Sequence, residues 1–356
     1  MITTSLCMIV KNEETVLARC LDSIADLMDE IIIVDTGSSD RTREIAARYT
    51  SKIYDYQWTN DFSAARNFSF SKATMEYIYT ADADEILDEE NRRRFLRLKS
   101  CLLPEIEIVQ MKYINASELD TVLNTQKEYR PKLFKRLRSF TWVDPVHETV
   151  RLQPVVFDSD IEILHKPQSL HSKRDFSIFI KAFKHDGQFS SKIRAMYAKE
   201  LLKTGDTKDF MDAKPIFQAI LENDTSDDAR KEASCILAHI HRLEGNKNEF
   251  FKLTMKDMLT DPCSEICYEL GMFFLAERDY AEAVLWFYNA AYETGSILDV
   301  HTGGDLPLLG LVECYELLLA EEKARIPSDM ALIIQYELLL DKYRAASRDW
   351  TLPEEL

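Results

Sequence analysis

The sequence predicts two domains: an α/β domain whose sheet is mostly parallel, followed by an all-α domain. In the first half, apolar and β-branched runs alternate with segments of helical period, which is the order of a parallel sheet with crossover helices. From about Asp175 onward, nearly every segment has a helical period instead. A chain of 356 residues is long enough for two such domains. We therefore expect the α/β domain at residues 1–170 and the helical domain at residues 171–356.

The elements of the first domain follow from the hydrophobic pattern. Strands are predicted at residues 4–10, 31–34, 52–56 and 77–81, with shorter candidates at 106–113, 132–134 and 155–157. Helices are predicted at residues 17–27, 41–49 and 62–72, the second with Ser39 or Asp40 as its N-cap. Ligands of open parallel sheets lie outside the carboxyl ends of the strands. The loops at 11–14, 35–40 and 82–85 are therefore expected to converge on one crevice.

One segment of the second half fits a helical repeat of about 34 residues. With Ser264 as its first position, the small and large residues of a tetratricopeptide repeat fall on Leu270, Gly271, Phe274, Ala283, Phe287 and Ala290. A weaker copy places Ala238 where the first has Gly271, and a third, degenerate copy could span 195–221. We expect tetratricopeptide-like pairs of antiparallel helices, and a non-repeating helical bundle is the alternative.

The charge of the chain argues against some classes of partner. Its formal net charge is −17, which disfavours non-specific binding to nucleic acid or to an anionic membrane. Four basic residues nevertheless gather within a short stretch: Lys132, Lys135, Arg136 and Arg138. They could line a basic groove or form an ordinary solvated face. The N-terminus lacks the pattern of a signal peptide and no apolar run is long enough for a membrane span, so a cytoplasmic protein is expected.

The seven cysteines predict reduced core residues rather than a disulfide framework. Their number is odd, and most of them stand among apolar neighbours. Cys263 and Cys267 are four residues apart, with no second pair of cysteines or histidines close in the sequence. A structural zinc site is therefore not expected from this spacing.

Two acids end the fourth predicted strand. Asp82 and Asp84 follow an apolar, aromatic run and are separated by one residue. Alternate residues of an extended chain point the same way, so the two carboxylates could share one hard divalent cation. Such a cation readily binds the phosphates of a nucleotide as well. An acidic turn that caps the next helix is the alternative for an isolated pair of this kind.

Four stretches in order place this pair in a wider pattern. They are Cys7-Met-Ile-Val-Lys-Asn-Glu-Glu14, Ile31-Ile-Ile-Val-Asp-Thr-Gly-Ser-Ser-Asp40, Asp61-Phe-Ser-Ala-Ala-Arg-Asn-Phe68 and Ala81-Asp-Ala-Asp-Glu85. Together they resemble the motifs of the family two glycosyltransferases, which carry the Rossmann-like GT-A fold. With a helical repeat domain attached, the whole chain also resembles bacterial transferases that glycosylate peptides or proteins, including bacteriocin precursors. This resemblance favours the metal site over the acidic turn.

The resemblance implies roles for individual residues. It implies a UDP-sugar donor, with UDP-glucose favoured, that is bound by Val10, Asn12, Glu14, Asp35, Thr36, Arg66, Asp82 and Ala83. Asp84 would bind Mg²⁺ or Mn²⁺ directly, whereas Asp82 would face the ribose or bridge to the metal through water. Thr36 departs from the second aspartate that is common in the family. Arg66 would face the nucleotide, or else is an arginine on an amphipathic helix near an acidic turn.

A segment near residue 145 is the best source of a general base. Trp142-Val-Asp-Pro-Val-His-Glu148 brings three ionisable residues beside an aromatic ring. We expect Glu148 or Asp144 as the base that accepts the acceptor's proton, and His147 near the metal or the diphosphate. Hydrogen bonds that merely stabilise a loop are the alternative for each. His165 could supply a late ligand, although a satisfied core histidine is the simpler interpretation.

These expectations combine into one enzymatic hypothesis with two alternatives. The leading hypothesis is a metal-dependent, inverting transfer of a hexose from a UDP-sugar to a serine, threonine or cysteine of a peptide or protein. The first alternative is a transferase that acts on a glycan acceptor. The second is a non-catalytic repeat scaffold with a vestigial nucleotide-sugar fold. Exposed faces of the repeat could bind the acceptor or a second copy in a homodimer.

Overall fold

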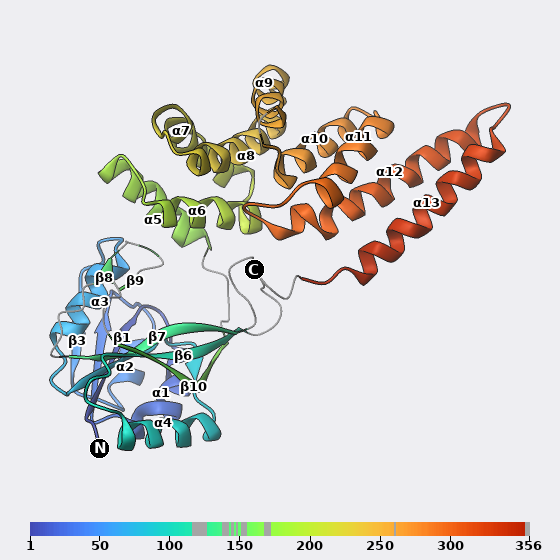
Figure 1. Ribbon diagram of the computed structural model, residues 1–356. Helices are drawn as coiled ribbons and strands as arrows, with labels where there is room; N and C mark the ends of the chain where they lie inside the picture. The colour runs from blue at the N-terminus through green and yellow to red at the C-terminus, as the bar shows by residue number, and fades with distance from the viewer. Residues whose placement is uncertain are drawn as a thin grey trace. The chain divides into compact units, whose positions relative to one another are not determined.

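The computed structural model describes two compact units. It describes residues 1–115, 127–136, 142–143, 146, 149–150, 155–166, 172–259 and 261–352. The units are Met1–Ala182 and Phe183–Leu356, so the division falls inside helix α5 (Ser172–Asp186). The boundary expected at 170/171 lies just before this helix. Figure 1 shows strands only in the first unit and helices alone in the second, which confirms the predicted fold class.

An eight-stranded sheet forms the centre of the first unit. Its strands are β1 (Thr4–Val10), β2 (Glu30–Asp35), β3 (Ile53–Asp55), β4 (Tyr77–Thr80), β5 (Glu85–Ile86), β6 (Ile108–Asn115), β7 (Lys127–Lys135) and β10 (Val156–His165). Their spatial order is β3-β2-β1-β4-β7-β6-β10-β5. The first four are parallel, β7 is antiparallel to both β4 and β6, β10 is parallel to β6, and β5 is antiparallel to β10. Two short strands, β8 (Trp142–Val143) and β9 (Thr149–Val150), pair separately.

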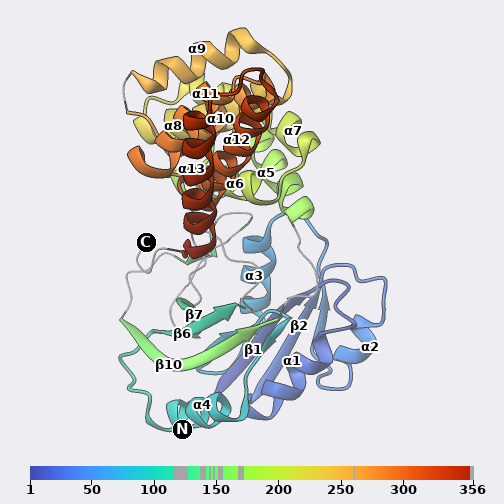
Figure 2. The ribbon, with the colours of Figure 1, turned by 90° about the vertical axis from the view of Figure 1, so that its right-hand side faces the viewer.

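Helices cover both faces of this sheet. They are α1 (Leu17–Ile24) with the 3₁₀ turn η1 (Ala25–Leu27), α2 (Thr42–Ala46), α3 (Phe62–Ser71) and α4 (Glu89–Cys101). Buried side chains of α1, α2 and α4 share one core cluster with Leu6 and Met8 of β1. Phe70 of α3 lies in a second cluster with Cys7 of the same strand. Figure 2 shows α1 and α4 on one side of the sheet and α3 on the other. This arrangement follows from strand geometry, because successive side chains point to opposite faces.

Several predicted elements differ in extent from those observed. The second helix is shorter than predicted, and its N-cap position is Arg41, whose side chain makes no cap bond. The carboxylate of Asp40 instead accepts a hydrogen bond from the Thr42 N–H, 3.0 Å away. Strands β7 and β10 are much longer than the predicted cores of three residues each. The sequence pattern also gave no indication of the two-residue strand β5.

The second unit consists of successive helices. After α5 come α6 (Ser191–Thr204), α7 (Thr207–Asn223), α8 (Asp227–Leu243), α9 (Lys247–Met258), α10 (Ser264–Ala276), α11 (Tyr280–Tyr288), α12 (Asp305–Ala324) and α13 (Met330–Asp349). A π-helical turn, η2 (Asn289–Glu293), extends α11, and a 3₁₀ turn, η3 (Val300–Gly303), precedes α12. No helix within the described ranges is both long and apolar enough to cross a membrane.

The close contact between α10 and α11 agrees with the predicted repeat. A Cβ atom added to Gly271 would lie 2.6 Å from the ring of Phe287, so only glycine permits this approach without rearrangement. Gly310 of α12 meets the other side of the same ring, where an added Cβ would lie at 2.7 Å. Small residues opposite a large one let helix backbones approach, as in tetratricopeptide repeats.

Candidate active site

The loops after β1 and β2 are joined by hydrogen bonds at the carboxyl edge of the sheet. Asn12 has a positive φ of 57°, and its N–H donates to Ser38 Oγ at 3.0 Å. The side-chain oxygen Oδ1 of Asn12 accepts a hydrogen bond from the Ser39 N–H at 2.8 Å. Glu14 accepts from both the backbone N–H and the Nε of Arg41, at 3.1 and 3.2 Å. Asn12 and Glu14 therefore brace the two loops against each other.

Asp35 and Thr36 lie at the end of β2, and both are buried. Asp35 Oδ1 accepts hydrogen bonds from the backbone N–H and the hydroxyl of Ser38, at 3.0 and 2.7 Å. Its other oxygen, Oδ2, lies 3.7 Å from Arg43. The Thr36 hydroxyl donates to the Val10 carbonyl at 3.2 Å, as does its N–H at 3.0 Å. Asp35 Oδ1 accepts two hydrogen bonds, whereas Oδ2 has only the longer contact with Arg43. Oδ2 is therefore the better acceptor for a ligand.

Arg66 projects from α3 toward the end of β4. Its side chain is buried, donates to the Thr80 hydroxyl and lies 3.6 Å from Asp82 Oδ1. Its guanidinium also lies over the ring of Trp142, 4.5 Å from the centroid, at a distance typical of a cation–π contact. The arginine is therefore buried and faces the acidic turn, whereas its expected contact with a nucleotide stays a prediction.

The acidic turn carries the two aspartates at unequal exposure. About half of the Asp82 side chain is exposed, at 49%, whereas only 20% of Asp84 is exposed. Ala83 between them is buried, and the Glu85 N–H closes the turn on the Asp82 carbonyl at 3.2 Å. The geometry thus presents Asp82 outward and holds Asp84 deeper, so the two acids have different surroundings.

His165 is the nearest basic partner of Asp84. Its Nε2 lies 3.0 Å from Asp84 Oδ2, although the two residues are 81 positions apart in the chain. The antiparallel pairing of β10 with β5, with His165 opposite Glu85, creates this contact. His165 is consequently part of the acidic turn's surroundings, where it is 25% exposed and has a hydrogen-bond partner, and its role as a late ligand stays a prediction.

A buried ion pair lies beneath the turn. Lys132 of β7 donates to Glu85 Oε1, and both side chains are almost fully buried. The other Glu85 oxygen has no hydrogen-bond partner among the described residues. Arg130, two positions before Lys132, lies over the ring of Tyr113 at 3.8 Å. His165 packs near the same ring, 5.1 Å between centroids.

These neighbours determine the charge state of the acids. Loss of water around the half-exposed Asp82 opposes its ionisation, but electrostatic interactions with Arg66, Lys132 and His165 lower its pKa to about 2. Burial raises the pKa of Glu85, and Lys132 opposes that effect. Asp82 is therefore ionised at neutral pH, and the site combines fixed negative charge with several cations within one edge of the sheet.

The basic cluster noted in the sequence does not form one groove. Lys132 is buried with Glu85, whereas Lys135 donates to the carbonyl of Pro104 and Arg136 to that of Met75. Arg138 lies outside the described residues. Both interpretations offered from the sequence, a basic groove and a solvated face, therefore fail for Lys132.

The predicted catalytic segment is described only in part. Asp144, His147 and Glu148 lie outside the described residues, so their roles remain predictions. Trp142, which opens the segment, is held by α3: Asn67 donates to its carbonyl at 3.2 Å and accepts from its N–H at 2.9 Å. These two hydrogen bonds to α3 fix the start of the segment next to Arg66.

Comparisons with known proteins identify the first unit. Residues 5–151 match the family model described as glycosyl transferase family 2. A TPR repeat-containing protein from Synechococcus elongatus is 49% identical over 87 residues, which is 24% of this chain and 22% of that protein. The SPbeta prophage-derived glycosyltransferase SunS from Bacillus subtilis is 34% identical over 125 residues, 34% of this chain and 30% of that protein. The chain thus spans less than a third of the length of these two relatives.

Among solved structures, the fold is similar to a glucosyl-3-phosphoglycerate synthase from Mycobacterium tuberculosis. The identity is 16% and the TM-score 0.41, over 53% of this chain and 82% of the other. A likeness this distant says nothing about ligands. Strand β10, which carries His165, begins after the end of the matched segment at residue 151. Residues 5–151 form a glycosyl transferase family 2 domain, and the chain continues from it into a tetratricopeptide-like helical domain.

Proposed function

We propose that this chain is a metal-dependent glycosyltransferase that takes a hexose from a UDP-sugar. The observation that carries the proposal is the Asp84–His165 contact of 3.0 Å at the carboxyl edge of the sheet, next to the ionised Asp82. Acids and cations alternate around this corner, and a family 2 domain supplies the context. A divalent cation bound to a diphosphate carries both kinds of charge, so it complements a site with both acidic and basic side chains better than a cation or an anion alone.

The residues at this corner fit a divalent cation. Asp84 offers a carboxylate oxygen and His165 an imidazole nitrogen from a separate strand, so two ligand atoms already converge. Mg²⁺ prefers oxygen ligands, whereas Mn²⁺ also accepts one imidazole readily. We therefore favour Mn²⁺, with Asp84 and His165 as its protein ligands and Asp82 as an outer neighbour. When bound, the cation would neutralise charge on the departing diphosphate.

The chain's own residues would hold the nucleotide. Arg66 lies 3.6 Å from Asp82 and could turn one guanidinium N–H toward a phosphate oxygen, which suits its fixed fork of donors. Asp35 could accept a hydrogen bond from the ribose or the base through Oδ2. Three residues already form hydrogen bonds with protein groups: Asn12, Glu14 and Thr36. We therefore propose that they stabilise the loops that bind the nucleotide. Val10 and Ala83 would contribute backbone and contact surface.

The helical domain supports the acceptor side of the proposal. SunS is named as a glycosyltransferase, and the tetratricopeptide-like helices offer surfaces of the kind that bind peptides. We propose a peptide or protein side chain as acceptor, with Asp144 or Glu148 as the base that receives its proton. A glycan acceptor remains the second candidate, since the donor corner does not distinguish the two.

Hydrolysis of UDP-glucose in the absence of acceptor tests the donor half of this proposal. Turnover should require Mn²⁺ or Mg²⁺ and stop when a chelator is added. Asp84→Asn should lower turnover by at least about 100-fold, because it removes a direct ligand of the metal. Glu89→Gln changes an acid that is 80% exposed and serves as the matched control. Undiminished, chelator-resistant hydrolysis by folded Asp84→Asn would exclude the assigned metal site.

The acceptor requires a separate measurement. The chain is incubated with UDP-glucose, Mn²⁺ and a library of peptides that contain serine, threonine or cysteine, and the products are weighed by mass spectrometry. A peptide gain of one hexose supports the proposal. Transfer to oligosaccharides alone would favour the glycan alternative, and donor binding without any turnover would favour the scaffold.

A further inference from the structure

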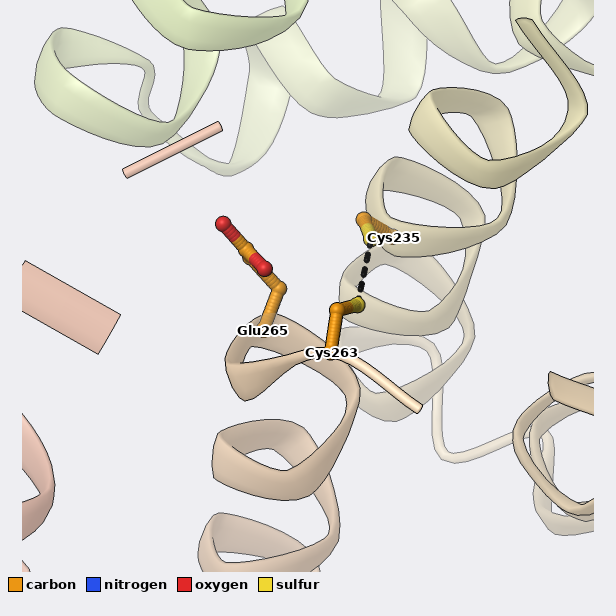
Figure 3. Close-up of side chains that lie close together, drawn as sticks. All are labelled: Cys235, Cys263 and Glu265. Atoms are coloured by element: carbon orange, nitrogen blue, oxygen red, sulfur yellow. Dashed lines mark hydrogen bonds between the residues drawn. The ribbon is translucent and has the colours of Figure 1, made fainter. Parts of the chain in front are cut away.

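Three ligand-type side chains converge inside the helical unit, away from the proposed donor site. Cys235 lies on α8, Cys263 stands at the N-cap position of α10, and Glu265 lies in the first turn of the same helix. The two sulfurs are 3.5 Å apart, and one Glu265 oxygen lies within 4.8 Å of both. Figure 3 shows the thiols facing each other, with Glu265 beside Cys263 at the start of α10 and its carboxylate to one side of the thiol pair.

The burial of these side chains is nearly complete. Cys235 and Cys263 are each 1% exposed and Glu265 is 2% exposed. Glu265 Oε1 accepts three backbone hydrogen bonds, from Ile297, Leu298 and Asp299, at 2.7 to 3.0 Å. Its Oε2 has no hydrogen-bond partner in the described part of the chain, although it is buried. A carboxylate held rigidly by one oxygen, with the other left over, is costly unless something binds it.

The distances suit a tetrahedral thiophilic cation. Two sulfurs bound to one Zn²⁺ at about 2.3 Å each would lie about 3.7 Å apart, close to the observed 3.5 Å. A disulfide would require a sulfur–sulfur distance of about 2.05 Å, so the two cysteines are free thiols that do not form a disulfide. Two sulfurs with one carboxylate favour zinc over Mg²⁺ or Ca²⁺, which prefer oxygen ligands only.

We propose that Cys235, Cys263 and Glu265 form a zinc site in the helical domain. Binding would form two Zn–S bonds and one Zn–O bond and release two thiol protons to solvent. Three protein ligands leave one tetrahedral position for water or another small ligand. The site joins α8 to the start of α10, and it stands independently of the proposed transferase activity.

The surrounding charges are compatible with this site. Two thiolates and a carboxylate around Zn²⁺ would carry one net negative charge. Lys231 lies one turn before Cys235 on α8 and interacts electrostatically with both sulfurs. It also donates a hydrogen bond to Asp261. Its ammonium group would offset that remaining charge.

The sequence could not reveal this cluster. The visible spacing was that of Cys263 and Cys267, but the Cys267 sulfur instead lies 3.9 Å from Met258 Sδ. The partner of Cys263 is 28 residues earlier, on a different helix. The expectation drawn from the spacing of Cys263 and Cys267 therefore concerned a different pair of cysteines from the one proposed here.

Cobalt titration of the full chain tests the proposal. Chelator-treated protein is titrated with Co²⁺, which substitutes for Zn²⁺ and gives a thiolate-to-cobalt charge-transfer band. We expect this band to saturate near one equivalent, to disappear when Zn²⁺ is added, and to persist in Asp84→Asn, since the donor corner has no sulfur ligand. Zinc addition should also release about two protons per chain in weak buffer.

Variants and a second measurement keep the test decisive. Cys235→Ser and Cys263→Ser should lose the band, and Glu265→Gln should weaken binding about tenfold or more. Cys314→Ser replaces another buried cysteine, on α12, and should bind as the wild type does. Serine at a buried position can prevent folding, so the cobalt titration of the wild-type protein is the measurement that decides. No charge-transfer band from folded wild type, or a Cys235–Cys263 disulfide in freshly purified protein, overturns the proposal.

Discussion

Arg66 gives the clearest test at the scale of a single residue. We expect Arg66→Ala to weaken UDP binding by about 10 to 100-fold, because a charge-assisted hydrogen bond to phosphate contributes about 1.5–3 kcal/mol. Arg66→Lys should recover part of the loss, since it keeps the charge but not the fork of donors. Calorimetric titration with UDP and Mn²⁺ measures both. If the folded Arg66→Ala variant binds UDP with the same affinity as the wild type, Arg66 is not part of the nucleotide site.

Thermal unfolding must accompany that experiment. Arg66 is buried, donates to Thr80 and lies over Trp142, so its loss could also disturb the fold. An unchanged melting temperature together with weaker UDP binding would assign the effect to the ligand. A large drop in melting temperature would instead indicate a mainly structural role.

Glu30 gives a prediction about pH and stability. Burial alone would raise its pKa, but hydrogen bonds from Lys52, Ser5 and Thr74 lower it to about 2 from the ordinary 4.5. A depressed pKa in the folded state means that ionised Glu30 stabilises the fold above pH 4.5. This contribution, on the order of 3 kcal/mol, is lost as the pH falls toward 2.

Urea denaturation of Glu30→Gln measures this contribution. At pH 7 the variant should be less stable than the wild type, and the difference between the two should shrink between pH 4.5 and 2. Glu44→Gln, an exposed acid on α2, should match the wild type throughout. A difference that stays constant with pH would show that Glu30 acts through packing rather than charge.

At the scale of the element, Phe287 supports a prediction about helix packing. Gly271 and Gly310 meet opposite sides of its ring, so the ring cannot shift away from one helix without striking the other. Gly271→Val should therefore destabilise the helical unit by about 1–3 kcal/mol through overpacking. Gly295→Val is the control, because nothing lies within 4 Å of a Cβ added there. Equal melting temperatures for the two variants would contradict the close contact.

Elements also explain what the sequence could predict and what it could not. Strands β1 to β4 and helices α1 and α3 have local patterns of hydrophobic residues, and these patterns predicted the elements that carry or precede Arg66, Asp82 and Asp84. The assignment of Arg66 to the nucleotide came from the resemblance to the family and stays a prediction. The Asp84–His165 contact depends on the pairing of β10 with a strand of only two residues. No periodicity is visible in so short a strand. The contacts across the sheet therefore had to be observed in three dimensions.

The same reason applies to the buried pair of Lys132 and Glu85. In the sequence, Lys132 stood among other basic residues and looked like part of a charged surface. In the structure its strand is antiparallel to both β4 and β6, and its side chain reaches Glu85 in the interior. Antiparallel pairing of distant strands decides which face of the sheet a residue occupies, and a local charge pattern does not contain that information.

The charge of the whole molecule gives a further prediction. The chain has a net charge of −17 at pH 7 and a sequence pI of about 5.0. Mutual repulsion between copies therefore vanishes near pH 5, where solubility should be lowest. Turbidity of concentrated protein across pH 4 to 8 measures this, with added salt as a check on the electrostatic origin. A solubility minimum far from pH 5 would indicate that hydrophobic surface dominates association instead.

Strand β10 has a consequence for the order in which the proposed metal corner is assembled during synthesis. Asp84 leaves the ribosome long before His165, and the strand that carries His165 must insert between β6 and β5 to reach it. Nascent chains that stop before residue 156 contain the aspartates and Arg66 but lack this last strand. During synthesis, the proposed metal corner is therefore completed late, only after the ribosome has translated the whole sheet.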